Sequence, residues 1–319
     1  MGNAVSIADA ARLLLAANDI LILTHRRPDG DTSGCAGALC RGLRALGKAA
    51  FVLPNPESTA RYEPLLAPFY PESAAYEPKF IVSVDLADLG LFPDNAKIYQ
   101  ERVDLAIDHH RSNPLFAENN IVTPEAGACA ETIYDILMAM GVPLTRELAE
   151  PLYVAVSTDT GCFRYSNTTP HTHAVAAACL STGLDGGEWN RMLFETKSRP
   201  RFEMERIIFE SMEFFEDGKI ALAMLYRADI DRTRASMDDL DSIAALPRQI
   251  EGVEIGLTIT ENKDGSAKVS VRTTKEVDAS ALCRQVGGGG HLRAAGASFD
   301  VFADARETML RICQAVYHG

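Results

Sequence analysis

Six histidine and aspartate side chains form the most informative pattern in this chain. Each lies shortly after an apolar segment, and the six are His25, Asp29, Asp31, Asp85, His109 and Asp159. Carboxylate oxygens combined with imidazole nitrogens favour Mn²⁺ or Mg²⁺ over a soft metal. The residue types and their spacing therefore predict a divalent-metal site.

Four apolar runs, at residues 20–23, 80–84, 105–107 and 153–156, precede these side chains. We expect the ends of the runs to meet at one edge of a sheet, because ligands bind beyond the carboxyl ends of parallel strands. Six ligands are too many for one cation that keeps positions open for substrate, but they suit two cations that share a bridging carboxylate. Metal pairs roughly 3.5–4 Å apart are a recurring arrangement for phosphoester hydrolysis.

The elements that position these residues alternate between strands and helices. The predicted strands are 20–24, 50–53, 80–84 and 103–107; the predicted helices begin after Ser6 and at 32–46, 128–140, 145–151 and 170–182, with the apolar run 153–156 between the last two. Gly34 and Gly37 are expected to let the second helix pack closely against its neighbours. This alternation implies a doubly wound, mostly parallel α/β sheet.

A chain of 319 residues is too long for a comfortable single core, so we expect two domains. The doubly wound domain would cover residues 1–187, followed by a helical connector at 188–215 with a break near Pro200. Residues 216–319 would form a smaller α/β substrate-binding domain. Its expected elements are a strand at 219–226, a helix at 238–249, a hairpin of 253–260 with 267–273, and a final helix at 303–317.

The composition limits the partners of the protein. Thirty-one Lys and Arg face 44 Asp and Glu, a formal net charge of −13, which argues against tight binding of long duplex nucleic acid. Seven scattered cysteines without a C-x-x-C motif fit reduced thiols in the cytoplasm. No apolar stretch reaches the roughly 20 residues of a membrane span, and residues 1–8 lack the order of a secretory signal. We therefore expect a cytoplasmic protein without membrane association.

One stretch of the acidic chain is locally basic. Residues 266–295 carry five Lys and Arg against two acidic residues, a net charge of about +3. The stretch includes four consecutive glycines, Gly287–Gly290, directly before His291. Glycines allow close backbone approach, so main-chain N–H groups there are expected to hold a phosphate. A glycine run by itself is more often a flexible turn, but here it accompanies the metal pattern.

Together these motifs resemble the DHH phosphoesterase superfamily over nearly the whole chain. The matching segments are His25-Arg-Arg-Pro-Asp-Gly-Asp31, Val84-Asp85, Asp108-His109-His110, Ser157-Thr-Asp-Thr-Gly161, and Gly288-Gly-Gly-His291 with Ala294-Ala-Gly296. Length and layout are most similar to the nanoRNase/pAp phosphatase group, which is related to the exonuclease RecJ. Dimerisation is expected from the resemblance, as a homodimer.

The resemblance implies a role for each residue of the site. His25 and Asp29 would hold one cation, Asp31, His109 and Asp159 the other, and Asp85 would bridge the two Mn²⁺ or Mg²⁺ ions. Asp108 would orient a ligand, and His110 would face the substrate phosphate as a catalytic group. The expected substrate contacts are Arg164, Arg272, Gly289, Gly290, His291 and Arg293.

The implied activity is hydrolysis of short RNA or DNA oligonucleotides to mononucleotides, and of 3′-phosphoadenosine 5′-phosphate to AMP. A hydroxide held between the metals would attack phosphorus in line. Three alternatives stay open at this point: a phosphodiesterase of cyclic or linear dinucleotides, a pyrophosphatase, and a non-catalytic nucleotide sensor. The Gly-Gly-Gly-His segment speaks against pyrophosphate, and the complete ligand set speaks against a sensor.

Overall fold

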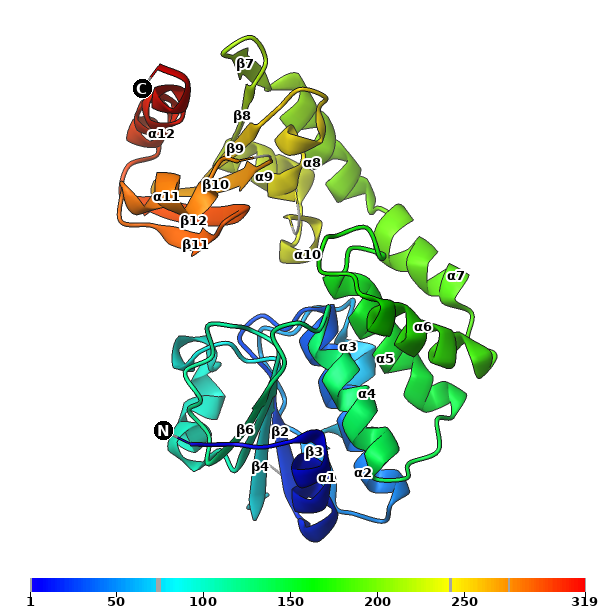
Figure 1. The fold of residues 1–319 in the computed structure, drawn as a ribbon. Helices are drawn as coiled ribbons and strands as arrows, with labels where there is room; N and C mark the ends of the chain where they lie inside the picture. The colour runs from blue at the N-terminus through cyan, green and yellow to red at the C-terminus, as the bar shows by residue number, and fades with distance from the viewer. Residues whose placement is uncertain (1, 73–75, 241–242, 275, 319) are drawn as a thin grey trace. The chain divides into compact units, whose positions relative to one another are not determined.

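The computed structural model describes residues 2–72, 76–240, 243–274 and 276–318 (Figure 1). It divides into two compact units, Met1–Thr196 and Lys197–Gly319. The boundary between the units falls inside the segment expected as a helical connector. None of the helices in the described residues is both long and apolar enough to cross a membrane.

The first unit is built on a six-stranded, entirely parallel sheet with the order β1-β6-β5-β4-β2-β3. Its strands are β1 (Asn3–Ala4), β2 (Ile20–Leu23), β3 (Ala50–Val52), β4 (Phe80–Val84), β5 (Leu105–Asp108) and β6 (Asn119–Val122). The four predicted strands are confirmed. The sequence did not indicate β1, which has two residues, or β6, which begins with two polar asparagines.

Helices cover one face of this sheet, and 3₁₀ segments and loops cover the other (Figure 1). The helices are α1 (Ile7–Ala16), α2 (Gly30–Ala45), α3 (Glu63–Leu66), α4 (Cys129–Ala139), α5 (Arg146–Asp159), α6 (Pro170–Ser181) and α7 (Gly186–Asn190). The 3₁₀ segments η2 (Leu89–Leu91) and η3 (Asp94–Arg102) follow β4. Alternate residues of β2 enter the two cores, Ile20 and Ile22 on the helical side and Leu21 and Leu23 on the other. The α/β fold class expected from the sequence is confirmed.

The apolar run at 153–156, whose end was expected to meet three strand ends at the edge of the sheet, does not form a strand. It belongs to α5, which continues from Arg146 through Pro151 to Asp159. A short run of buried apolar residues has the same pattern in a central strand and in a buried helix, and an internal proline reads as a boundary. Asp159 therefore reaches the site from the end of a helix.

Helix α2 packs tightly on α5 and α3 through its glycines. A Cβ atom on Gly34 would lie 2.3 Å from the carbonyl oxygen of Pro151, and one on Gly37 would lie 2.6 Å from that of Leu65. Both obstacles are backbone atoms that a rotamer change cannot move. The close approach brings the start of α2 against the end of α5, where Asp159 lies.

Gly34→Ala is expected to destabilise the protein by about 2 kcal/mol, because the added methyl group must separate α2 from α5. Gly42→Ala is the matched control on the same helix, since its Cβ would meet only the end of the Leu137 side chain. The intrinsic helix preference for Ala offsets part of that contact, so a loss below about 1 kcal/mol is expected. Urea unfolding of both variants measures the difference. Equal stability of the two variants would contradict the packing argument.

The second unit contains a mixed sheet with the order β11-β12-β10-β9-β8-β7, in which only β8 and β9 pair in parallel among the described strands. Its strands are β7 (Glu213–Phe215), β8 (Ile220–Leu225), β9 (Ile255–Glu261), β10 (Ala267–Thr273), β11 (Gly289–His291) and β12 (Ala294–Phe299). Its helices are α8 (Arg199–Glu210), α9 (Arg227–Thr233), α10 (Met237–Leu240), α11 (Ala279–Arg284) and α12 (Phe302–His318).

Four predictions can be compared with this unit. The strand expected at 219–226 is confirmed as β8, the hairpin is confirmed, with Gly265 at a φ of +81° in its turn, and so is the final helix. The single helix expected at 238–249 is wrong. The described residues there form the end of α10 and two 3₁₀ turns, Ile243–Ala245 and Pro247–Gln249, while residues 241–242 lie outside the described part. Pro247 cannot donate a helical hydrogen bond, which favours a new turn at that point.

Candidate metal centre

The candidate site lies at the carboxyl end of β2, where the strand order of the first sheet reverses. From β2 the chain passes through α2 to β3 on one side, whereas β4 and β5 lie on the other side of β2. His25 and Asp29 follow β2, Asp85 follows β4, and His109 follows β5. Open α/β sheets bind ligands at such a switch point, beyond the carboxyl ends of the strands.

Asp29 and Gly30 set the start of α2. Asp29 Oδ1 accepts hydrogen bonds from the backbone N–H groups of Asp31 at 3.0 Å and Thr32 at 3.1 Å, so this carboxylate caps the helix. Gly30 is needed because a Cβ atom there would lie 2.3 Å from Thr158 Oγ1. These contacts place Asp31 and Asp159 at adjoining helix ends.

Asp31 is buried and caps a second helix. Its Oδ2 accepts a hydrogen bond from the Cys129 N–H at 2.7 Å, and its Oδ1 accepts from the Ala130 N–H at 3.1 Å and from Cys35 Sγ at 3.3 Å. The N-cap residue of α4, Ala128, has no side-chain acceptor of its own. A helix N-terminus favours a negative charge, so α4 helps to hold this carboxylate inside the protein.

Asp85 lies between His25 and His109. Its Oδ2 is 3.7 Å from His25 Nε2, and its Oδ1 is 3.5 Å from His109 Nε2. The backbone has a φ of +53°, a sterically unfavourable value for a residue with a side chain. Its Oδ1 is buried without a hydrogen-bond partner among the described residues. A buried acceptor of this kind is what a bound cation would satisfy.

The candidate ligands form two groups of three residues. One group contains Asp85, and the other lies next to Asp85. His25, Asp29 and Asp85 form one group, and Asp31, His109 and Asp159 form the other, with the ligand atoms of each group within 4.8 Å of one another. A third possible group combines Asp85, His109 and His110. The six residues proposed as ligands from the sequence therefore come together, and their donor set fits divalent cations.

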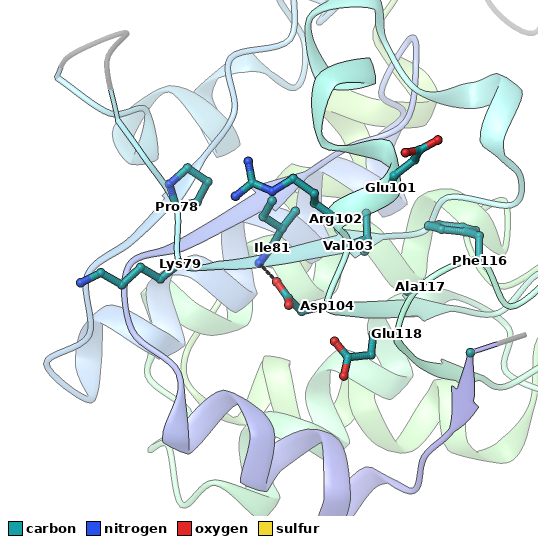
Figure 2. A pocket seen from close by; sticks show the side chains of 11 residues that line it. Pro78, Lys79, Ile81, Glu101, Arg102, Val103, Asp104, Phe116, Ala117 and Glu118 are labelled. Atoms are coloured by element: carbon teal, nitrogen blue, oxygen red, sulfur yellow. Dashed lines mark hydrogen bonds between the residues drawn. The ribbon is translucent and has the colours of Figure 1, made fainter.

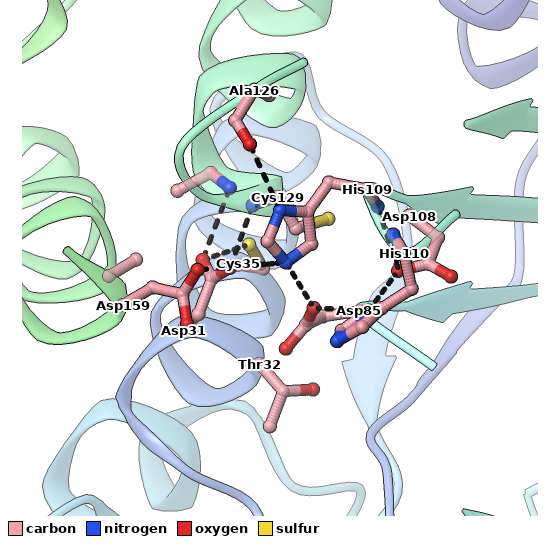
Figure 3. A network of polar contacts seen from close by, with 12 residues as sticks. Asp31, Thr32, Cys35, Asp85, Asp108, His109, His110, Ala126, Cys129 and Asp159 are labelled. Atoms are coloured by element: carbon pink, nitrogen blue, oxygen red, sulfur yellow. Dashed lines mark hydrogen bonds and ion pairs between the residues drawn. The ribbon is translucent and has the colours of Figure 1, made fainter. Parts of the chain in front are cut away.

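Polar neighbours orient both histidines of the DHH segment (Figure 3). His109 Nδ1 contacts the Ala126 carbonyl oxygen at 3.2 Å, which places the proton on Nδ1 and leaves Nε2 for the site. His110 Nδ1 contacts Asp108 Oδ1 at 2.8 Å. Asp108 also accepts a hydrogen bond from Asn113 Nδ2 at 2.7 Å. The position of Asp108 is consistent with the orienting role expected for it.

The carboxylates repel one another without a counter-ion. Burial and the charges of neighbouring carboxylates raise the pKa of both Asp31 and Asp85 well above the ordinary value. Burial also raises the pKa of Asp159 to about 6, although the nearby His109 opposes this shift. The pKa of Asp108 is lowered, because the hydrogen bonds from His110 and Asn113 outweigh its burial. Full ionisation of these carboxyl groups is therefore unfavourable unless a cation offsets their charge.

The arginines expected to contact substrate donate hydrogen bonds to backbone carbonyl oxygens. Arg164 is exposed, and its Nε donates to the Gly161 carbonyl oxygen at 2.6 Å. In the second unit, Arg272 Nη1 donates to the Val271 carbonyl oxygen at 3.1 Å, and Arg293 Nη1 donates to that of Val277 at 3.0 Å. Both guanidinium groups thus also support the backbone. Their contact with substrate stays a prediction.

The glycine run contributes to β11, an edge strand that pairs with β12. Gly290 has a φ of +141°, and a Cβ atom there would lie 2.7 Å from the Ala294 carbonyl oxygen. Gly289 has open space where a Cβ atom would be. The side chain of His291 lies outside the described part of the structure, so its expected phosphate contact stays a prediction, as does that of the two glycines.

Sequence reasoning missed the groups that support the centre. The Ala126 carbonyl and the N–H groups at the start of α4 are backbone atoms, which leave no residue-type signal. Asn113 could have been found from its place five residues after Asp108, in a polar loop that follows the DHH segment.

A pocket of about 470 Å³ lies elsewhere on the first unit (Figure 2). It is lined by residues that precede strands, such as Lys79 before β4, Asp104 before β5 and Glu118 before β6. The metal-ligand candidates follow the opposite ends of these strands. This pocket therefore contains none of the residues of the candidate centre.

Comparison with known proteins identifies the class. Residues 19–156 match the DHH family, N-terminal domain, and residues 217–317 match the DHHA1 domain. The chain belongs to the DHH family, which confirms the resemblance seen in its motifs. It is 31% identical over 300 residues to the bifunctional oligoribonuclease and PAP phosphatase NrnA of Thermus thermophilus, covering 93% of this chain and 89% of that one.

Other relatives agree with this placement. The NrnA of Bacillus subtilis is 25% identical over 297 residues, which cover 90% of this chain and 91% of that protein. An exopolyphosphatase-related protein from Bacteroides fragilis has a TM-score of 0.86 at 24% identity, covering 97% of this chain and 95% of the other. RecJ from Thermus thermophilus, in complex with Mn²⁺, has a TM-score of 0.55 at 13% identity, covering 97% of this chain and 55% of the other. The two structural likenesses show a shared fold.

Proposed function

We propose that the protein is a divalent-metal-dependent phosphohydrolase of short oligonucleotides, which it cleaves to mononucleotides, and of 3′-phosphoadenosine 5′-phosphate, which it converts to AMP. The observation that carries the proposal is the position of Asp85, whose two oxygens face the histidines of two adjoining ligand groups. The printed activities of the NrnA relatives supply the substrate class.

Each side chain of the centre has a proposed task. His25 and Asp29 would hold one ion, Asp31, His109 and Asp159 would hold the other, and Asp85 would contact both. A bound pair of Mn²⁺ or Mg²⁺ ions would lower the pKa of a water and offset charge on the phosphate oxygens.

His110 is the proposed group that faces the phosphate. Its Nδ1 is occupied by Asp108, so its Nε2 is the nitrogen left for substrate. Asp108 would hold the ring in this orientation, as carboxylate partners of histidine do. His110 Nε2 would then face the phosphate and its leaving oxygen, where an imidazole can serve as a general acid.

The basic segment of the second unit supplies further proposed substrate contacts. Arg272, Arg293, His291 and the backbone at Gly289–Gly290 are the proposed contacts for a terminal phosphate, and Arg164 is proposed to contact substrate from the first unit. A small cluster of cations suits two or three nucleotides, whereas the overall charge of −13 disfavours a long duplex. A homodimer and a cytoplasmic location stay predictions from the sequence.

Turnover of a ribodinucleotide and of 3′-phosphoadenosine 5′-phosphate by the purified protein tests the proposal. With Mn²⁺ present we expect mononucleotide and inorganic phosphate, respectively, and with chelator no product. A cyclic dinucleotide is the comparison substrate, since the chain is 25% identical to a relative called cyclic-di-AMP phosphodiesterase GdpP while spanning 48% of its length. Faster cleavage of the cyclic substrate would replace the proposed activity with the alternative, and no turnover of any substrate would refute both.

A further inference from the structure

A single peptide unit connects a buried carboxyl group with the metal-ligand candidate His109. The carbonyl oxygen of Ala126 accepts from His109 Nδ1 at 3.2 Å (Figure 3). The next backbone N–H, that of Gly127, donates to Glu131 Oε1 at 2.9 Å. The carbonyl and the N–H belong to the same peptide bond. Glu131 and His109 therefore contact opposite ends of one rigid, polar group.

Glu131 is a buried carboxyl group at the start of α4. It lies in the first turn of α4, and only 2% of its surface is exposed. Its Oε1 also accepts a hydrogen bond from the hydroxyl group of Thr172. Burying a carboxyl group is costly unless hydrogen bonds compensate, and here both donors converge on one oxygen. The arrangement fixes the carboxyl group as an acceptor for the Gly127 N–H.

Gly127 fits closely between these groups. A Cβ atom at this position would lie 2.7 Å from Thr172 Oγ1, 2.8 Å from the Asn167 carbonyl oxygen and 2.9 Å from Glu131 Oε1. No side chain fits there, so the peptide unit is confined on the side opposite His109. Its orientation, and with it the direction of the Ala126 carbonyl, has little freedom.

Asn167 connects the Ala126–Gly127 segment with Asp159, another metal-ligand candidate. Its Nδ2 donates to the Gly127 carbonyl oxygen at 2.8 Å and to the Asp159 carbonyl oxygen at 3.2 Å. The segment that orients His109 is thereby joined to the end of α5, which carries Asp159. Both residues belong to the ligand group that includes Asp31.

We propose that Glu131 is a positioning residue that acts on His109 through the Ala126–Gly127 peptide unit. By accepting from the Gly127 N–H it fixes and polarises the peptide, which strengthens the hydrogen bond from His109 Nδ1 to the Ala126 oxygen. That bond holds His109 Nε2 toward Asp31, Asp85 and Asp159, from which it is 3.9, 3.5 and 3.7 Å distant. A carboxylate that accepts a hydrogen bond from a metal-binding histidine raises the affinity of that histidine for the metal. Here the Ala126–Gly127 peptide unit lies between the carboxylate of Glu131 and the ring of His109.

The proposal rests on the two-metal centre of the proposed function, but its test requires no substrate. Calorimetric titration of the metal-free full chain with Mn²⁺ measures the affinity of each ion, and its thermal unfolding with chelator reports folding. In Glu131→Ala we expect one of the two ions to bind about 10–100-fold more weakly and the other to change less than about threefold. In Glu131→Gln we expect both affinities within about threefold of the parent, because the two donors hold the amide oxygen in the place of Oε1.

Glu205→Ala is the matched control, since Glu205 is also a buried glutamate but pairs with Lys197 and Arg201 in the second unit. It is expected to leave both Mn²⁺ affinities unchanged. Parental binding of both ions by folded Glu131→Ala would overturn the proposal, and so would equal weakening of both. Should Glu131→Ala not fold, Thr172→Val decides: selective weakening of one ion supports the proposal, and unchanged affinities refute it. A parent that binds two ions without cleaving any substrate would refute the proposed function and leave this inference standing.

Discussion

Replacing Asp85 with Asn is expected to lower kcat on a ribodinucleotide by on the order of 10³-fold or more. One oxygen of Asp85 faces His25 and the other faces His109, so the change removes a charge that both proposed ions share. Steady-state kinetics at saturating Mn²⁺ measures the effect. Thermal unfolding of the metal-free variant should show no loss of stability, because the described residues offer no hydrogen-bond donor to the buried Oδ1 and Asp31 repels the carboxylate.

Asp104→Asn is the control for this experiment. Asp104 precedes β5, at the other end of the same sheet, and accepts a hydrogen bond from the Ile81 N–H, which an amide oxygen can also accept. Its kcat should stay within about twofold of the parent. Substantial activity in Asp85→Asn, above about a tenth of the parent, would show that this carboxylate does not bridge the catalytic ions.

Mn²⁺ is expected to raise the unfolding temperature of the first unit by about 10 °C or more. Each ion at about 100 times its Kd adds about 2.7 kcal/mol to stability when only the folded state binds it. For a unit of this size, 1 kcal/mol corresponds to roughly 2–4 °C. The physical source is the repulsion among Asp29, Asp31, Asp85 and Asp159, which a cation reverses into attraction. Differential scanning calorimetry with Mn²⁺ and with chelator measures the shift.

Two comparisons make this shift specific. Asp85→Asn should lose at least about half of the rise, since both ions lose a ligand, whereas Asp104→Asn should keep all of it. An equal rise in both variants would mean that Mn²⁺ binds elsewhere. Absence of any rise in the parent would contradict a metal centre in the first unit.

The fold could be predicted where local pattern and tertiary setting agree. The runs at 20–23, 80–84 and 105–107 are short and apolar because both faces of a central parallel strand are buried, and these strands were found correctly. The hairpin of β9 and β10 was found from its polar, glycine-containing turn. The helix predicted at 238–249 is wrong because the spacing of apolar residues is similar in one helix and in a series of short 3₁₀ turns.

The site could be predicted better than the elements that carry it. The structure brings Asp159 next to Asp31 and His109, as the proposed ligand set requires, but the apolar run before Asp159 is part of a helix. What makes the centre rigid could not be read from residue types. Its supports are the backbone groups at Ala126 and the start of α4, and they meet His109 and Asp31 only because distant segments pack together. Side chains carry a signal in the sequence, and backbone partners do not.

The direct test of the central claim is a crystal structure of the protein grown with Mn²⁺, with anomalous diffraction recorded at the manganese absorption edge. We expect two anomalous peaks roughly 3.5–4 Å apart, one on the Oδ2 side of Asp85 near His25 and Asp29, the other on the Oδ1 side near Asp31, His109 and Asp159. A single peak, or peaks that Asp85 does not contact, would contradict the two-metal centre on which the proposed function rests.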